Sequence, residues 1–138
     1  MIDKHVIYLG LGSNIGDKEA HIRQALTRIG ELVGDIVRQS ALYVTHPWGF
    51  ESQNLFVNAV VCCHTTLPPR RLLAVTQQIE REMGRTVKSR NGEYHDRVID
   101  IDILLYDDLH ISYPDLKIPH PLMFQRDFVM TPLREIWP

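Results

Sequence analysis

The sequence lacks the features that mark membrane-spanning, secreted and strongly basic nucleic-acid-binding proteins. No apolar run in its 138 residues approaches the length of a membrane span. Its first residues carry no signal-peptide pattern, and a formal net charge of −2 gives no general attraction to nucleic acid or to an anionic membrane. We therefore expect a cytoplasmic protein with a single domain over residues 1–138, and neither nucleic acid nor a membrane as its partner. We also expect a monomer, although these features do not bear on the oligomeric state.

Cysteine is also scarce, because Cys62 and Cys63 are the only two and they are adjacent. Neighbouring side chains on a strand face opposite sides, so a disulfide between these two residues is not expected. This pattern fits a reducing compartment. Repeats and low-complexity segments are absent, and 44% hydrophobic with 23% charged residues is ordinary for a globular protein with a packed core.

The order of the expected elements predicts an α+β fold. Strands are expected over residues 5–11, 36–44, 55–65 and 97–106, with helices between about residues 17 and 33 and between residues 68 and 84. A short returning strand should follow over residues 109–111, and residues 122–138 should form short helical turns packed on the core. This order is typical of a ferredoxin-like antiparallel sheet with helices on one face, here with a short hairpin and C-terminal helical turns added.

The last long strand carries the strongest chemical signal. Its odd-numbered residues from Ile99 to Leu105 are all aliphatic and should face the helices. The opposite face, which ends in Tyr106, carries Asp100 and Asp102 with Cα atoms roughly 6.6 Å apart. Like charges repel, and a divalent cation such as Mg²⁺ would offset that repulsion; a solvated face of an edge strand is the alternative.

Aromatic and amide side chains elsewhere could bind a flat heterocycle. Asn is uncommon in strands, yet Asn58 shares one strand face with Phe56. An amide beside an aromatic ring can bind the edge of a heterocycle, although a hydrogen bond to a neighbouring loop explains Asn58 equally well. Trp48 and Phe50, in a loop after the second strand, could cover a flat ligand or simply anchor that loop.

Basic residues gather directly before the strand that carries the two aspartates. The polar run over residues 85–97 contains Arg85, Lys88 and Arg97 and leads into Asp100. Arginine and lysine beside a carboxylate-bound metal ion recur in polyphosphate chemistry, whereas a solvated loop is the ordinary explanation of such a run.

Two further patterns stay open. His120 lies between two prolines on a stiff backbone, which suggests a ligand or phosphate contact, or else a plain loop histidine. Glycines at positions 10, 12 and 16 match neither the dinucleotide-binding fingerprint nor a Walker A loop. These glycines could let a phosphate approach the backbone, but we favour the interpretation that they simply permit a strand-to-helix turn.

Several motifs spread along the chain belong together. They are Leu-Gly-Ser-Asn at residues 11–14 with Gly16, Tyr-x-Thr-x-Pro at 43–47, Phe-x-Asn-Ala at 56–59, the run 77–85, Arg-x-x-Asp-x-Asp-Ile at 97–103, Pro119-His120 and Arg126-Asp-Phe128. The Arg-x-x-Asp-x-Asp-Ile element is the most specific of them. This set resembles the 6-hydroxymethyl-7,8-dihydropterin pyrophosphokinase family over nearly the whole chain.

The resemblance implies a reaction and its cofactors. A pyrophosphoryl group would pass from ATP to the hydroxymethyl oxygen of 6-hydroxymethyl-7,8-dihydropterin, with AMP as the other product, in folate biosynthesis. In the family two Mg²⁺ ions bind paired aspartates and bridge the ATP phosphates, and Asp100 and Asp102 occupy those positions. Catalysis would then consist mostly of positioning and charge neutralisation, without a protein nucleophile.

The resemblance also implies roles for individual residues. The catalytic residues would be Arg85, Arg97, Asp100 and Asp102. The pterin-binding residues would be Thr45, Pro47, Trp48, Phe56, Asn58 and Phe128. The ATP-binding residues would be Leu73, Gln77, Glu80, Arg85, Lys88, Arg97, Ile103, His120 and Arg126.

The chain departs from the family pattern at several positions. Phe56 stands where Tyr is common, and the run 86–96 is longer than in the best-known bacterial members and lacks their Trp, for which Tyr94 could substitute. Pro121 follows His120 where an aromatic residue is often seen. The chain also ends without the longer tail of many members.

From the residues alone, two other functions remain. One is a metal-dependent phosphohydrolase that uses the Asp pair with His120 to activate water. The other is a non-enzymatic RNA-binding module, because ferredoxin-like sheets often bind RNA through exposed aromatic residues. The two carboxylates and the acidic balance weigh against RNA.

Overall fold

The structure is a computed structural model that describes residues 3–46, 54–84 and 98–138. Its strands are β1 (His5–Ser13), β2 (Gly34–Gln39), β3 (Tyr43–Thr45), β4 (Phe56–Thr65), β5 (Asp100–Tyr106), β6 (Ile111–Tyr113) and β7 (Leu116–Ile118). Its helices are α1 (Lys18–Leu32), α2 (Pro69–Glu82), the 3₁₀ helix η1 (Met123–Gln125) and α3 (Asp127–Ile136).

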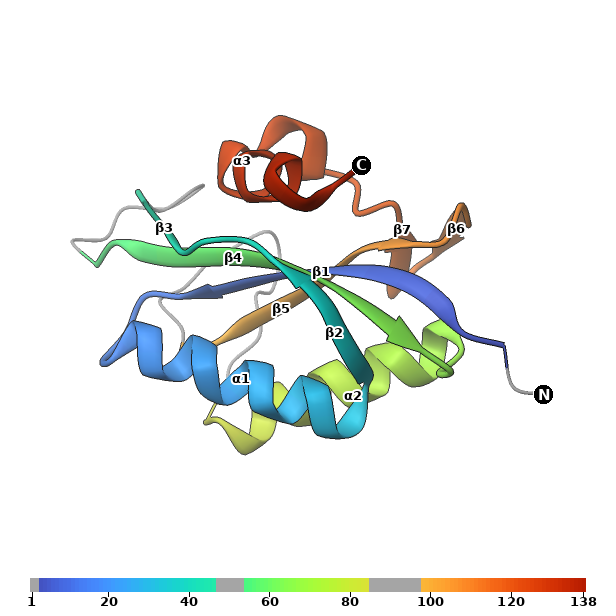
Figure 1. Cartoon of the computed structure of the whole chain (residues 1–138), viewed down its shortest axis with the longest axis horizontal. Coiled ribbons are helices and arrows are strands. Elements are labelled where there is room, and N and C mark those ends of the chain that lie inside the picture. Colours follow the sequence, from blue (N-terminus) through green and yellow to red (C-terminus); the bar gives the residue numbers. More distant parts are fainter. Residues whose placement is uncertain (1–2, 47–53, 85–97) are drawn as a thin grey trace.

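The main sheet is antiparallel, with strands in the order β2-β4-β1-β5 and with β3 pairing along β4 beyond the end of β2. Helices α1 and α2 lie against one face and α3 lies against the other (Figure 1). The predicted ferredoxin-like α+β fold is confirmed. Within the described ranges no helix is long and apolar enough to cross a membrane.

Apolar residues of the sheet, α1 and α2 meet on one side of the sheet. Ile7 and Leu9 of β1, Ile29 of α1, Ile79 of α2 and Ile103 of β5 are at most 5% exposed. Each such side chain contributes about 1.5–3 kcal/mol when it is fully buried. This face therefore holds the main hydrophobic core.

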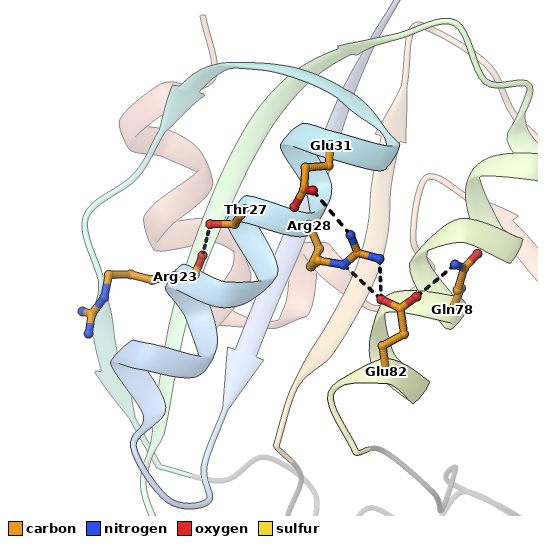
Figure 2. Close-up of polar contacts among 6 residues, drawn as sticks. All are labelled: Arg23, Thr27, Arg28, Glu31, Gln78 and Glu82. Atoms are coloured by element: carbon orange, nitrogen blue, oxygen red, sulfur yellow. Dashed lines mark hydrogen bonds and ion pairs between the residues drawn. The ribbon is translucent and has the colours of Figure 1, made fainter.

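Local signals set both helix starts, and polar contacts tie the two helices together. Asp17 caps α1 by accepting a hydrogen bond from the Ala20 N–H at 3.2 Å, and Pro69 begins α2 where a missing N–H is harmless. Two N–H groups of Arg28 on α1 donate to one oxygen of Glu82 on α2 at 3.0 and 2.6 Å (Figure 2). These contacts link α1 and α2 on the side away from the sheet.

A second, smaller apolar cluster forms on the opposite face beneath α3. Tyr8 and Cys62 of the sheet pack there with Met130 and Leu133 of α3. Cys63 instead belongs to the main core, and both cysteines are free, as strand alternation predicted. The expected C-terminal turns comprise one 3₁₀ turn and the ten-residue helix α3.

One expected strand is divided in two. The prediction of a single strand over residues 36–44 is wrong, because β2 ends at Gln39 and β3 begins at Tyr43. The Ser40 hydroxyl accepts the Val60 N–H at 2.9 Å, where a backbone carbonyl would otherwise accept it. A side chain thus replaces the backbone in the ladder at this point, and the pairing with β4 resumes at Tyr43.

The bounds expected for the returning strand, residues 109–111, are also wrong, because β6 spans Ile111–Tyr113. It pairs with β7 and so forms the expected short hairpin. Asp107 holds the end of β5 to β1: its N–H donates to the Val6 carbonyl at 2.8 Å, and its carboxylate accepts the Val6 N–H at 2.7 Å. The chain therefore leaves the main sheet after Asp107 and forms a separate hairpin.

A β-bulge at Leu104 changes which face the last residues of β5 occupy. Consecutive residues of β1 pair with Ile103 and Leu105, so Leu104 has no partner on β1. Tyr106 consequently joins the main core, and Leu105 packs against the α3 cluster. The prediction that Leu105 faces α1 and α2 while Tyr106 shares the aspartate face is wrong, since simple alternation does not count the extra residue.

Candidate active site

A cavity of about 460 Å³ opens beside α3, on the same face of the sheet. Strands β1, β3, β4 and β5 contribute to it, and so do α2 and the segment that leads into α3. The residues expected to bind substrates that line this cavity are Thr45, Phe56, Asn58, Leu73, Gln77, Glu80, Asp100, Asp102, His120, Arg126 and Phe128. The fold therefore gathers side chains that lie far apart in the sequence.

Two rows of residues across neighbouring strands form the cavity floor. In one row Gly12 of β1 lies between Asp100 of β5 and Asn58 of β4. In the next row Gly10 pairs with Asp102. Because glycine has no side chain, the space between the carboxylates and the amide stays open. A Cβ atom at Gly12 would come within 2.9 Å of Asn58 Oδ1, so a side chain there would displace the amide.

The interpretation of the three glycines as turn residues holds only for Gly16, whose φ is 69°. Gly10 and Gly12 lie inside β1 and line the cavity. Glycine weakens a strand interior and often marks a close approach of other groups. Glycines inside a strand could have indicated such a site from the sequence. They were instead interpreted as turn residues, because the first strand was expected to end at residue 11.

One end of the cavity, along β3 and β4, presents an amide, a hydroxyl and the aromatic ring of Phe56. Asn58 is 4% exposed, and its Nδ2 donates to Thr45 Oγ1 at 2.6 Å. Asn58 is thus hydrogen-bonded to the neighbouring strand β3 rather than to a loop. The side chains of both Asn58 and Thr45 line the cavity. Phe56 and Phe128 line the same cavity from β4 and α3, and the Arg126 guanidinium lies 5.4 Å from the centre of the Phe128 ring.

The other end presents the two carboxylates, on the outermost strand of the sheet. Asp100 and Asp102 are half-buried and line the cavity from β5. The outer edge of β5 is occupied: the Ile101 N–H donates to the Glu80 carboxylate at 2.9 Å, and the His120 N–H donates to the Leu104 carbonyl at 3.0 Å. These bonds hold β5 from the side that has no neighbouring strand.

His120 is half-buried next to this carboxylate end. Burial lowers the pKa of the His120 imidazole and the nearby Arg126 lowers it further, while Asp100 acts in the opposite direction. The net shift is downward, so the neutral imidazole is favoured near pH 7. A neutral imidazole can donate one hydrogen bond through its N–H and accept another, or act as a ligand.

The donor set of this end fits a hard divalent cation. Within the part of the chain that the structure describes, no group of three or more His, Cys, Asp or Glu side chains could hold a metal ion. Asp100 and Asp102 therefore offer a pair of carboxylates rather than a complete cage. Mg²⁺ is commonly bound in this way, through one or two carboxylates with substrate phosphates completing its shell.

The remaining predicted residues lie elsewhere. Ile103 is 5% exposed and packs in the main core, and it borders a smaller hollow of about 270 Å³ that shares Leu73, Asp102 and His120 with the cavity. The other predicted site residues, Pro47, Trp48, Arg85, Lys88 and Arg97, lie outside the described residues. Sequence reasoning did not place Gly10, Gly12, Thr76 or Leu122 in the site, although all four line the cavity.

Comparison with known proteins gives one consistent answer. The family model for 7,8-dihydro-6-hydroxymethylpterin-pyrophosphokinase matches residues 8–138. The chain is 49% identical over 134 residues to the 2-amino-4-hydroxy-6-hydroxymethyldihydropteridine pyrophosphokinase of Porphyromonas gingivalis. This alignment covers 96% of this chain and 91% of the Porphyromonas gingivalis protein. It is 43% identical over 133 residues to the enzyme of the same name from Bacillus subtilis. That alignment covers 96% of this chain and 78% of the Bacillus subtilis protein.

The fold is also similar to that of a longer protein. The crystal structure of wild-type HPPK-DHPS from Plasmodium falciparum matches 96% of this chain with a TM-score of 0.74 and 16% sequence identity. This chain spans 40% of the length of that protein.

The fold, the cavity and these relatives define an ATP-dependent diphosphokinase, an enzyme that transfers a pyrophosphoryl group. The motif at residues 97–103 indicates the same class. The chain belongs to the 7,8-dihydro-6-hydroxymethylpterin-pyrophosphokinase family.

Proposed function

We propose that the cavity is where this enzyme transfers the pyrophosphoryl group of ATP to the hydroxymethyl group of 6-hydroxymethyl-7,8-dihydropterin. The products are AMP and the pterin diphosphate, in folate biosynthesis. The family match and the names of the relatives support this reaction, and the arrangement of the cavity supports a role for each end.

The pterin binds at the end that carries Asn58 and Thr45. An amide has two donors and an acceptor, so this hydrogen-bonded pair keeps polar capacity for the pterin edge. Phe56 and Phe128 stack on the ring, and such pairs are worth about 0.5–1.5 kcal/mol beyond burial. The family resemblance adds Pro47 and Trp48 to the pterin-binding residues.

The ATP phosphates bind at the end that carries Asp100 and Asp102, which hold two Mg²⁺ ions. When bound, Mg²⁺ supplies charge neutralisation to the phosphate oxygens. Arg126 and His120 donate to the phosphates from the segment before α3. The nucleotide extends along Leu73, Gln77, Glu80 and Ile103, and Arg85, Lys88 and Arg97 add positive charge by resemblance alone.

The observation that carries this proposal is the row in which Gly12 separates Asn58 from Asp100. Antiparallel partners lie about 4.5–5.5 Å apart, so the two flanking Cα atoms are roughly 10 Å apart. That span leaves room above Gly12 for the hydroxymethyl group, between a pterin-binding end and a phosphate-binding end. Catalysis is then positioning and charge neutralisation, with no protein nucleophile.

The direct test mixes the protein with ATP, Mg²⁺ and 6-hydroxymethyl-7,8-dihydropterin and resolves the nucleotide products. We expect AMP to appear in step with a pyrophosphorylated pterin. ADP would indicate a single-phosphoryl kinase. Release of phosphate or pyrophosphate without transfer to the pterin would indicate the phosphohydrolase, and salt-sensitive RNA binding without ATP affinity would indicate the RNA-binding module.

We further propose a cytoplasmic monomer that binds neither nucleic acid nor a membrane. The buried free thiols of Cys62 and Cys63 support a reducing compartment. The small negative net charge supports small-molecule rather than polyanionic partners.

A further inference from the structure

Glu135, in the last turn of α3, makes hydrogen bonds that lie outside the cavity. Its two carboxylate oxygens accept the Ala41 N–H at 3.1 and 3.0 Å, and one of them accepts the Tyr43 hydroxyl at 2.8 Å. The bond to Glu135 is the main cause of the raised pKa of Tyr43. Ala41 lies in the connection between β2 and β3, and Tyr43 is the first residue of β3, so Glu135 anchors this connection to α3.

Strand β3 needs such an anchor because it is short and has a single neighbour. Among the described residues, its three residues pair only with β4, in a register that places Tyr43 opposite Asn58 and Thr45 opposite Phe56. Val44 between them is 66% exposed, so its side chain adds little apolar packing to the strand. The bond between Asn58 and Thr45 forms only if β3 lies correctly along β4.

Helix α3 carries the opposite wall of the same site. Phe128 lies in its first turn, and Arg126 immediately precedes the helix. Both line the cavity, as does Thr45 of β3. The hydrogen bonds of Glu135 at the far end of α3 therefore join the element that carries Phe128 to the element that carries Thr45.

We propose that Glu135 is a positioning residue for pterin recognition, because it fixes β3 relative to α3 and so sets the separation between Thr45 and Phe128. This inference rests on the proposed function, in which these two residues bind the pterin. It concerns the pterin end of the cavity, so ATP binding at the carboxylate end should not depend on it.

The test compares Glu135→Ala with Glu82→Ala. The Glu82 carboxylate also accepts three hydrogen bonds, two from Arg28 and one from Gln78, on the outer side of α1 and α2 (Figure 2). We expect Glu135→Ala to raise the KM for the pterin about tenfold, because bonds to charged acceptors are the stronger ones, and to leave the KM for ATP within about twofold. Glu82→Ala should change neither KM.

Two milder variants and a local measurement separate positioning from general stability. Glu135→Gln keeps an acceptor oxygen and should recover most of the pterin affinity. Tyr43→Phe removes one of the bonds and should raise the KM for the pterin about threefold. Amide hydrogen exchange over residues 43–45 should become faster in Glu135→Ala and stay unchanged in Glu82→Ala.

Equal KM values for the pterin in Glu135→Ala and Glu82→Ala would overturn the proposal. A parallel rise of both KM values with a lowered Tm would also overturn it, because that pattern is general destabilisation. If Glu135→Ala does not fold, an unchanged KM for the pterin in Tyr43→Phe overturns it. Wild-type protein that makes no pterin-dependent AMP would instead refute the proposed function, and the same assay distinguishes the two failures.

Discussion

The two faces of the main sheet are made by the same strands but differ in what they hold. The face beneath α1 and α2 is closed and apolar, with Ile7, Leu9 and Cys63 fully buried. The face on the α3 side is divided: one part packs against α3, and the rest forms the cavity floor with Gly12 and Asp100. Alternation along a strand lets one backbone serve both faces.

This difference shows how the sheet tolerates unfavourable residues. Glycine and aspartate are poor strand residues, and two like charges on one strand repel each other. The core on the other face supplies the hydrophobic free energy that keeps β1 and β5 paired despite Gly12, Asp100 and Asp102. Beyond Asp102 the same face of β5 carries Leu104 and Leu105, which pack in the cluster beneath α3, so the polar part of this face extends only as far as the cavity.

The largest expected effect is a loss of turnover, without a loss of stability, when either aspartate of the cavity is replaced. We expect Asp100→Ala or Asp102→Ala to lower kcat on the order of a hundred- to a thousandfold, as loss of a charge-stabilising group does, with unchanged thermal unfolding. The exposed Asp108, in the turn after β5, provides the control Asp108→Ala, which should retain activity. Wild-type turnover in either cavity variant would refute the metal assignment.

Truncations on the two faces should both reduce stability but differ in their effect on function. Ile29→Ala in α1 and Leu133→Ala in α3 each truncate a fully buried side chain, on opposite faces of the sheet. Each should lower the free energy of unfolding, measured by urea titration, by about 2–5 kcal/mol. Below the unfolding transition, only Leu133→Ala should raise the KM for the pterin, because α3 also carries Phe128. An equal rise in Ile29→Ala would show that the two faces are not independent.

Glu80 connects the two regions, because it belongs to α2 yet bonds the backbone of β5 between the two aspartates. Glu80→Ala leaves the Ile101 N–H without this acceptor and should lower the free energy of unfolding by about 1–3 kcal/mol. Glu80→Gln retains an acceptor oxygen and should therefore lower the free energy of unfolding by less. Chemical denaturation of the pair measures the difference, and identical losses would mean that this hydrogen bond contributes nothing.

The smallest expected effects come from a pair of glycines. Gly12→Ala places a Cβ atom 2.9 Å from Asn58 Oδ1, so it should raise the KM for the pterin while the protein stays folded. Gly30→Ala, in α1 with no heavy atom near the added carbon, should stabilise the protein by about 0.5–1 kcal/mol and leave kinetics unchanged. Unaltered pterin binding in Gly12→Ala would mean that Asn58 does not contact the substrate.

Much of the molecule could be predicted from the chain, and the failures share a cause. The order of the elements predicted the fold class, and the motif from Arg97 to Ile103 predicted the family. The divided strand at Ser40 and the bulge at Leu104 were missed because each depends on a hydrogen bond or pairing across the sheet. Local patterns contain no information about such partners.

The order of residues alone sets which side chains share a face of a regular strand, because alternation is a property of the extended backbone. It also supplies the paired aspartates, the strand amide and the family motif. The folded chain, in contrast, is needed to bring Gly12 between Asp100 and Asn58, and to bring Glu135 to the passage from β2 to β3. Strand register and helix docking arise from contacts between segments distant in the chain, and packing the whole core selects among them.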